Sequence, residues 1–512
     1  MMPVEVLTRI ESLELELGLQ RAENERLRAE NRRLQAENRA LRADVVMLRA
    51  ENAELRQLLT ETRQALTAQG VQMAELERRL NQSSLNSSKP PSSDGPDVER
   101  PPRGKGKKGK RKRGGQAGHV GKGRELLPED QVSRFVDHYP SACAACGCLL
   151  MGADPAPERI QTIDIPPIAP IVEEHRIHSL SCLACGHVTK AEVPPDLRAS
   201  PFGPRLHAVV ALMSGLLRLA KREIRAALDI LYSVRVGVGS IPKMERRMKT
   251  ALDAPYDSVL QGIRGSPMVH QDTTGWRENK QRAQLWITAT LQLAHYHINP
   301  RANRKVARAL LGEDYDGVVV TDRTAVQAWS KQQWCWSHVG RDFAELAELK
   351  GGAWYGGRLQ ACARRVHAQW AERAAGKITH AEMVERLAPV REQVHRLLVN
   401  AADHAPSKRA SRVCAGLLKG EDKLWIFLEH EGVSPTNNHA ERCARKAVLW
   451  RAVSFGSDSA IGSRYAERIL TIVNTLRLQN RDRELLDWLV AARVAQLNGQ
   501  PGPNLLPVPS TP

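Results

Sequence analysis

Residues 266–298 read SPMVHQDTTGWRENKQRAQLWITATLQLAHYHI, and this stretch decides the fold class of the chain. It contains the apolar runs SPMVHQD and RAQLWITATLQLAHYHI, and DGVVVTDR at 316–323 adds a third run. Runs rich in β-branched and aromatic residues and bounded by polar turns are typical of strands. Helical patterns precede and follow them along the chain. We therefore expect a multidomain α+β fold.

Three carboxylates stand at the ends of these expected elements. Asp272 follows the strand PMVHQ, Asp322 follows the run VVV, and Glu441 begins a helix after Asn437 and Asn438. Carboxylates at such positions can converge at one sheet edge, where two Mg²⁺ ions about 3.5–4 Å apart flank a phosphate. Each also has an ordinary alternative: a turn at Asp272, a helix cap at Asp322, and a capping box of Asn438 with Glu441.

Length and charge limit the class of protein. The 512 residues suffice for about three folded units, and 42% hydrophobic residues exclude a wholly disordered chain. Lysine and arginine number 75 against 57 acidic residues, a net charge of +18 that favours nucleic acid or an anionic membrane as the partner. No uninterrupted apolar stretch of about 18 residues and no signal-like start occur, so we expect a cytoplasmic protein without a membrane span.

Two CxxC pairs predict a structural zinc site. Cys143 and Cys146 form the first pair, Cys182 and Cys185 the second, and a glycine follows each pair at once. Two residues between the sulfurs let one tight turn present both thiolates to a tetrahedral zinc. We expect a strand pair to bridge the long loop between the two knuckles. The alternative is a set of buried thiols, and Cys148 is a surplus candidate ligand.

A heptad pattern runs from Ile10 to Leu80. Position d is mostly leucine, and four a positions hold asparagine, which favours a parallel dimer because paired amides bond across the seam only in register. Pairs of opposite charge at g and the following e, such as Glu23 with Arg28, agree with this. The alternative is a solvated single helix. The a-position asparagines are Asn24, Asn31, Asn38 and Asn52.

A strongly basic linker follows the heptads. Seven of the nine residues from 105 to 113 are basic and the other two are glycine, so this run cannot build a core. We expect it to be disordered when free and to bind DNA phosphates without sequence preference, the alternative being a solvated charge run. The basic residues are Lys105, Lys107, Lys108, Lys110, Arg111, Lys112 and Arg113.

Residues 203–262 carry a helical pattern, with Ser240 as a candidate N-cap before IPKMERRMKTAL. Two of these helices fit a helix-turn-helix whose second helix offers Lys243, Arg246 and Arg247 to DNA. Any small helical bundle gives a similar pattern.

The patterns together predict eight segments. In chain order they are a coiled coil (1–82), a disordered basic linker (83–125), a zinc-binding module (126–200), a helical region (201–262), a strand-rich segment (263–344), a second helical region (345–430), a helical segment with Glu441 (431–495) and a disordered tail (496–512).

Five sequence motifs, taken in order, resemble those of a known protein family. The chain contains HQDTTGWR, VVVTDRTAVQAW, CWSHVGRDF, PTNNHAERCARKAVLWR and SFGSDSAIGSRYAERILT. In order and spacing they resemble those of the insertion-sequence 66 family of bacterial transposases. The upstream layout of heptads, NSSKPPSSD, GGQAGH and paired knuckles resembles the same family's large transposase. The resemblance covers about residues 5 to 495.

The resemblance implies an RNase H-like catalytic core with a DDE triad and a helical insertion before the glutamate. It implies that 263–344 and 431–495 are the two parts of one catalytic core and that 345–430 is the helical insertion between them. Asp272, Asp322 and Glu441 match the triad positions, which in this family would bind two Mg²⁺ or Mn²⁺ ions for strand cleavage and strand transfer. It also implies the partners: double-stranded DNA of element ends and target, a homodimer or higher oligomer, and two small accessory proteins. The expected location is the bacterial cytoplasm, on the nucleoid when bound to DNA.

Further residues could serve the site. Cys335 and His338 match a C-x-x-H string seen in DDE transposases, so His338 could contact the phosphate or orient a metal ligand; the alternative is a core histidine. Trp276 and Trp336 are candidates for base stacking, although buried tryptophans are commoner.

Basic residues follow the glutamate of the triad on one helix. Arg442, Arg445 and Lys446 could grip phosphates beside the metals, while Arg445 at i+4 could instead pair with Glu441. The predicted function is a DNA transposase. The alternatives are a catalytically inactive zinc-containing DNA-binding protein derived from such a transposase, and a coiled-coil architectural protein.

Overall fold

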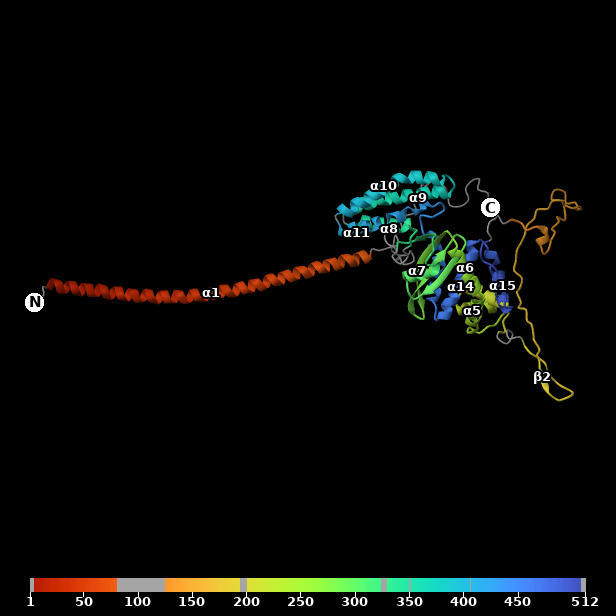
Figure 1. The fold of residues 1–512 in the computed structure, drawn as a ribbon, viewed down its shortest axis with the longest axis horizontal. Coiled ribbons are helices and arrows are strands. Elements are labelled where there is room, and N and C mark those ends of the chain that lie inside the picture. Colours follow the sequence, from red (N-terminus) through yellow and green to blue (C-terminus); the bar gives the residue numbers. More distant parts are fainter. Residues whose placement is uncertain are drawn as a thin grey trace. The chain divides into compact units, whose positions relative to one another are not determined.

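The computed structural model describes residues 4–80, 125–193, 200–323, 329–349, 351–405 and 407–507. The chain divides into two compact units, one of residues 1–84 with 89–96 and one of the remaining residues (Figure 1). Each unit is described by itself. No helix among the described residues is long and apolar enough to cross a membrane.

The first unit contains one long helix, α1 (Val4–Leu80). Its leucines at heptad position d are exposed in the single chain: Leu27 is 52%, Leu34 48% and Leu41 57% accessible. A row of exposed leucines along one stripe leaves apolar area in water, which favours association with a second helix.

A five-stranded mixed sheet lies at the centre of the second unit. Its order is β5-β4-β3-β6-β7, antiparallel from β5 to β3 and parallel from β3 to β7. The 282–298 run forms two strands, because Thr290 and Leu293 close a turn in its middle. The strands are β3 (Met268–Glu278), β4 (Gln281–Ala289), β5 (Ala294–Asn299), β6 (Val318–Thr321) and β7 (Gln332–Trp334).

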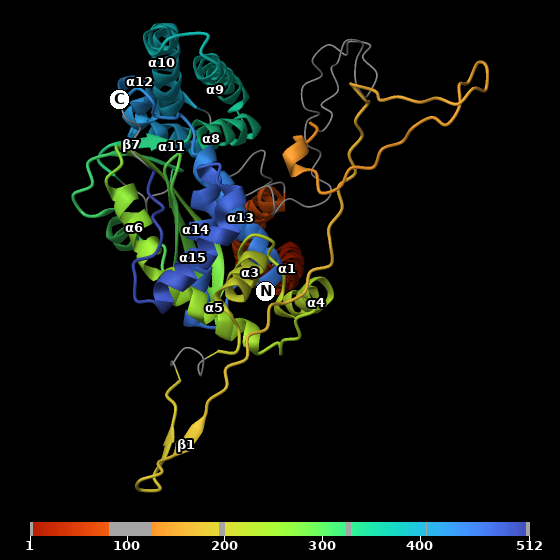
Figure 2. The ribbon, with the colours of Figure 1, turned by 90° about the vertical axis from the view of Figure 1, so that its right-hand side faces the viewer.

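Helices cover the antiparallel part of the sheet, some in direct contact with β3, β4 or β5 and the others packed on those helices (Figure 2). Apolar side chains such as Trp286, Ile287, Tyr296 and Ile469 form the buried core between them. These helices are α3 (Pro204–Gly215), α5 (Ser240–Ala251), α6 (Asp253–Arg264), α7 (Arg304–Leu311), α13 (Asn438–Ser454), α14 (Ala460–Leu478) and α15 (Leu485–Leu497). The glutamate helix α13 therefore contacts β3 and β4 directly.

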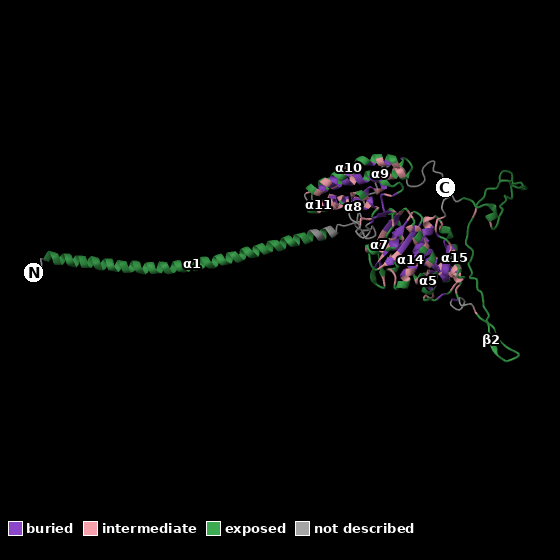
Figure 3. Cartoon of the chain, viewed as in Figure 1, coloured by how far each residue is buried: buried purple, intermediate pink, exposed green. Residues whose placement is uncertain are grey.

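A second core joins β6 to a set of helices that lies between β7 and α13 in the chain. Val320, Trp336, Phe343 and Trp425 are fully buried in it. Its helices are α8 (Trp336–Glu348), α9 (Ala353–Ala374), α10 (His380–His404), α11 (Lys408–Leu418) and α12 (Ile426–Glu429). Figure 3 shows these helices buried on the sides that face one another and exposed elsewhere.

A third cluster holds α3, α4 (Lys221–Tyr232) and α5 together through Val210, Met213, Ile224, Leu228 and Met244. Helices α4 and α5 contact each other and α3 contacts both. The short turn expected between α4 and α5 spans residues 233–239.

The segment 125–193 has little regular structure. Its strands are β1 (Ser179–Ser181) and β2 (Val188–Lys190), which form a hairpin. The expected strand pair between the knuckles is wrong, because residues 151–178 form no strand. Its prolines at 155, 157, 166, 167 and 170 withhold the backbone donors that a ladder requires.

The chain end also differs from its prediction. Residues 498–507 of the expected disordered tail follow the folded unit: Leu505 is buried and its carbonyl accepts a bond from the amide of Gln479. Leu506 lies against Gly262 of α6. The burial of these two leucines stabilises a segment whose proline-rich composition had predicted disorder.

Candidate active site

Strand register brings the two aspartates together. Strands β3 and β6 are parallel neighbours, and Gln271 pairs with Thr321. Asp272 and Asp322 are the next residues, so they stand at the same level on adjacent strands, which are about 4.8 Å apart in a sheet. The run VVVT keeps β6 buried up to this point, and its chain leaves the sheet at Asp322.

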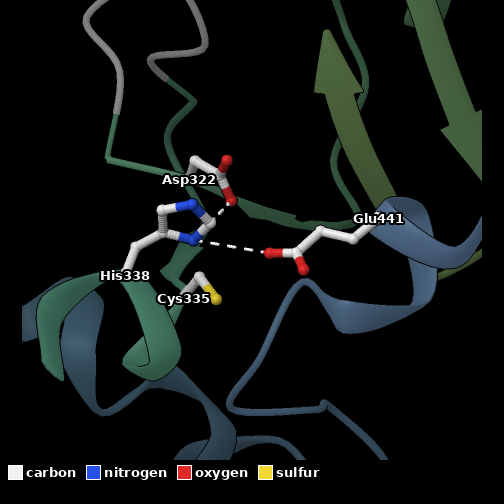
Figure 4. A group of neighbouring side chains, drawn as sticks. All are labelled: Asp322, Cys335, His338 and Glu441. Atoms are coloured by element: carbon white, nitrogen blue, oxygen red, sulfur yellow. Dashed lines mark ion pairs between the residues drawn. The ribbon is translucent and has the colours of Figure 1, made fainter. Parts of the chain in front are cut away.

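Glu441 and His338 complete the group. Glu441 lies in the first turn of α13, which packs on β3, and His338 lies in the first turn of α8. His338 Nδ1 is 3.1 Å from Asp322 Oδ1 and 3.6 Å from Glu441 Oε1 (Figure 4). Ligand atoms of Asp322, Cys335, His338 and Glu441 all lie within 4.8 Å of one another. Residues from three separate parts of the chain thus meet at one point.

The carboxylates repel one another in a partly dehydrated site. Burial raises the pKa of Asp322 to about 6, against the amide of Asn437 and the charge of Arg341, which lower it. Burial raises the pKa of Asp272 well above its usual range, and the charges of Asp322 and Glu441 add to this. Glu441 Oε1 is buried without a hydrogen-bond partner. Clustered carboxyl groups of this kind are stabilised by a cation.

Arg341 determines the tautomer of His338. An arginine nitrogen lies 3.0 Å from His338 Nε2, and a guanidinium can only donate. Nε2 therefore accepts, and the proton of the neutral ring is on Nδ1, facing Asp322 and Glu441. Burial and Arg341 lower the pKa of His338 to about 4. The ring thus presents an N–H donor to the carboxylates, not a lone pair to a metal.

The Cys335 thiol accepts a backbone hydrogen bond and stays neutral. Burial raises the pKa of its thiol to about 12, and the charge of Asp322 adds to this. Its Sγ accepts the backbone N–H of Asn437 at 3.2 Å. With the thiol neutral and the imidazole a donor, the free ligand atoms are carboxylate oxygens. Oxygen donors are what Mg²⁺ and Mn²⁺ prefer, so the residues fit such an ion.

Asn437 belongs to this group of contacts, and the sequence reasoning missed it. It is fully buried, and its side-chain N–H groups donate to the carbonyl of Gln271 at 3.0 Å and to Asp322 Oδ1 at 3.4 Å. Its Oδ1 lies 3.3 Å from His270 Nδ1. Asn437 therefore fixes the start of α13 against both aspartate strands. The asparagine pair before the helix was the available signal.

Several alternatives are now decided. Asn437 caps α13 without a side-chain hydrogen bond, and no bond of an Asn438–Glu441 capping box occurs among the described residues. Trp276 is 3% accessible and Trp336 is fully buried, so both are core residues and the base-stacking role is wrong for them. Their burial follows from apolar neighbours in two separate cores.

The two knuckles form the same local turn. Gly147 and Gly186 have φ of +74° and +69°, and each donates its N–H to the carbonyl of the first cysteine of its knuckle. Backbone N–H groups two and three residues on bond to the sulfurs of Cys143 and Cys182 and lower the pKa of these thiols. Each half-site therefore fits a thiolate-bound zinc.

The four sulfurs do not meet in one group among the described residues, where the cluster around Asp322 is the one such set of three or more metal-ligating side chains. The single tetrahedral site stays a prediction. All knuckle cysteines are exposed or half-buried, so the alternative of buried thiols is wrong.

The segments that carry these two sites match models of known protein families. A family model described as the transposase IS66 family matches residues 202–465, which include both aspartates and the glutamate. The chain belongs to the IS66 transposase family. The zinc-finger binding domain of IS66 transposases matches residues 140–186, the segment with both knuckles. Residues 19–125 match a family of unknown function.

A curated relative extends the similarity along the chain. The IS66 family chain is 24% identical over 429 residues to an uncharacterized protein, y4hP, of Sinorhizobium fredii, covering 73% of this chain and 74% of that protein. The expected membership of this transposase family is confirmed by the family matches.

The predicted DNA-binding residues are only partly visible. The basic run 105–113 lies outside the described residues. On α5, Lys243 and Arg246 are exposed and Arg247 is half-buried. On α13, Arg442 and Arg445 are exposed, and the described residues include no ion pair between Arg445 and Glu441. Burial and the charges of nearby arginines lower the pKa of Lys446. Arg442 and Arg445 thus present their charges at the surface of α13.

We expect one zinc ion per chain, lost on changing either knuckle. Cys143→Ser and Cys182→Ser each remove a thiolate that the backbone turn favours, so metal analysis of the purified full chain should find zinc near zero in both. Cys148→Ser serves as the control and should keep its zinc. Zinc reduced by half in each knuckle variant would instead indicate two independent sites.

Proposed function

We propose that this transposase cleaves and joins DNA through a DDE triad of Asp272, Asp322 and Glu441. The observation that carries the proposal is the approach of carboxylates from β3, β6 and α13 at one edge of the sheet. When bound there, two Mg²⁺ ions supply activation of the attacking oxygen and neutralise charge at the phosphate. The protein's own residues hold and orient the reacting groups.

His338 and the basic residues of α13 have distinct roles in this proposal. His338 Nδ1 lies 3.1 Å from Asp322 Oδ1 and 3.6 Å from Glu441 Oε1, so the ring stands between the two carboxylates and holds them near a common point. Arg442 and Arg445, one and four residues beyond Glu441, bind phosphates beside the cleaved bond. Arg341 acts through His338, as a positioning residue.

The sheet order supports an RNase H-like catalytic core. Three antiparallel strands followed by two parallel ones place the first aspartate on the central strand β3 and the second at the end of its neighbour β6. The helices α9 to α12 interrupt this core before the glutamate. In this proposal the insertion is the segment 345–430.

DNA ends are bound by several segments in this proposal. The zinc knuckles, the exposed residues of α4 and α5, and the basic run 105–113 contribute positive charge or a DNA-binding shape. Phosphate contacts by lysine and arginine make such binding weaken as salt rises. The partner is the double-stranded DNA of element ends and target.

We expect α1 to dimerise the chain as a parallel coiled coil. Leu34→Lys with Leu41→Lys places charges in the seam at d and should lower the solution mass of the full chain to that of a monomer. Ala36→Lys with Ala43→Lys makes the same change at the outer f position and should leave a dimer. Light scattering measures both. An unchanged mass in the seam variant would refute this dimer.

The experiment that tests the proposed activity uses labelled DNA carrying the element's ends. We expect cleavage and joined products with Mg²⁺ or Mn²⁺ and none without a divalent ion. Salt-sensitive binding without products would indicate the alternative, an inactive DNA-binding relative, or the need for accessory proteins. Absence of both binding and products would refute the function.

A further inference from the structure

Phe455 occupies an unusual position at the end of α13. It is the residue directly after the helix, its backbone is left-handed with φ of 57°, and its side chain is 79% exposed. A bulky residue rarely adopts this conformation, because its Cβ crowds the backbone, and glycine is the usual choice. Neither strain relief nor burial explains an aromatic side chain here.

The loop that carries Phe455 is firmly held. Ser457 N–H donates to the carbonyl of Arg277 at 2.9 Å, and its own carbonyl accepts the N–H of Asn279 at 2.8 Å. The indole N–H of Trp276 donates to Ser457 Oγ at 3.1 Å. The loop thus lies along the end of β3, and these three bonds hold Ser457, two residues after Phe455.

Two arginines face each other at this end of the hairpin. Arg277 on β3 pairs directly with Arg282 on β4, and both are exposed. Like charges opposite each other destabilise a strand pair. Among the described residues no ion pair joins either arginine to an acidic side chain, although Glu278 is the next residue after Arg277. An anion from outside the chain would satisfy this pair.

Helix α13 connects Phe455 to the catalytic group. Glu441 lies in the first turn of α13, and Phe455 is the residue directly after its last turn. From Glu441 to Phe455 the helix rises on the order of 20 Å, the length of about six base pairs of duplex.

We propose that Phe455, with Arg277 and Arg282, forms a DNA platform that contacts the duplex about six base pairs from the cleaved phosphate. The arginines bind backbone phosphates and the aromatic ring packs against a base or wedges into a base step. This inference rests on the proposed function and names the surface that carries the flanking DNA.

Glycine at 455 separates a DNA contact from a structural role. Phe455→Gly relieves the left-handed strain, so the variant should melt at the same temperature or higher. Its affinity for an element-end duplex should nevertheless fall roughly tenfold, as for the loss of one stacking contact. Phe455→Trp should keep the affinity. Asn480→Gly is the matched control, since Asn480 is also exposed with φ of 58°.

The salt dependence of DNA affinity tests whether Arg277 and Arg282 bind phosphates. Fluorescence anisotropy of the full chain with the labelled duplex, over a series of salt concentrations, should give Arg277→Gln with Arg282→Gln a slope smaller by roughly two phosphates. Phe455→Gly should leave the slope unchanged. A 2-aminopurine base placed about six base pairs from the cut should change its fluorescence with wild type and not with Phe455→Gly.

Unchanged affinity in Phe455→Gly would overturn the platform. A lowered solution mass with unchanged affinity would overturn it too, and would assign Phe455 to a contact with another protein chain. If the wild-type chain itself fails to bind the element end, the proposed function fails first. If it binds and cleaves while Phe455→Gly does the same, only this inference fails.

Discussion

Asp322→Asn is expected to slow metal-dependent cleavage of element-end DNA by on the order of a thousandfold while leaving DNA binding intact. The side chain lies at the meeting point of His338, Asn437 and Glu441. Asparagine keeps the shape and still accepts the Asn437 bond, but it removes the negative charge that holds a divalent cation. The variant therefore changes the chemistry without changing the fold.

The matched control for this substitution is Asp316→Asn. Asp316 lies just before β6, is largely exposed, and pairs with Lys331 at 2.6 Å. The same chemical change at the other end of the same strand should leave cleavage within about twofold of wild type, since surface ion pairs contribute little. Cleavage rates and DNA affinity are measured together on the same duplex.

Asp272→Asn and Glu441→Gln should repeat the result of Asp322→Asn. Burial and the charges of Asp322 and Glu441 raise the pKa of Asp272, and Glu441 has a buried oxygen without a partner. Each neutral variant also removes repulsion, so none should melt at a lower temperature than wild type. Cleavage by any of the three at the wild-type rate would place the active site elsewhere.

The strands and their aspartates were predictable because their signal is local. The run VVVT is apolar, β-branched and followed at once by Asp322, where β6 has ended. The expected strand PMVHQ is real but continues to Glu278, so Asp272 lies within β3 and its expected position at a strand end is wrong. Because the two strands are parallel and Gln271 pairs with Thr321, the next residues, Asp272 and Asp322, lie at the same level. The approach of Glu441 depended on the family resemblance, because no local pattern says which helix packs on β3.

Asn437 and Arg341 could not be predicted in the same way. Asn437 bonds to His270 and Asp322, which lie 167 and 115 positions away, and Arg341 bonds to His338 one turn back on the same helix. A buried amide is explained only when its neighbours are known. The tautomer of His338 follows from such a contact and from no pattern in the sequence.

The carboxyl groups give a pH dependence whose sign follows from their raised pKa values. The folded pKa of Asp322 is about 6, above the unfolded value of about 3.9. A folded state that holds protons more tightly is favoured at low pH. The contribution of the Asp322 carboxyl to the stability of the fold is therefore fully present below about pH 4 and is lost as the pH rises to about 6. Asp272 shifts in the same direction.

A divalent cation should restore this stability at neutral pH. Mg²⁺ binds the deprotonated carboxylates, so at a hundredfold excess over its Kd we expect about 2.7 kcal/mol of stabilisation at pH 8 and almost none at pH 5. Thermal unfolding of the full chain in buffer without free divalent ions, with Mg²⁺ then added, measures this without a chelator that would remove the predicted zinc. Asp316→Asn should respond as wild type does. Asp322→Asn should lose the response, and a full response in that variant would show that Mg²⁺ binds to other residues.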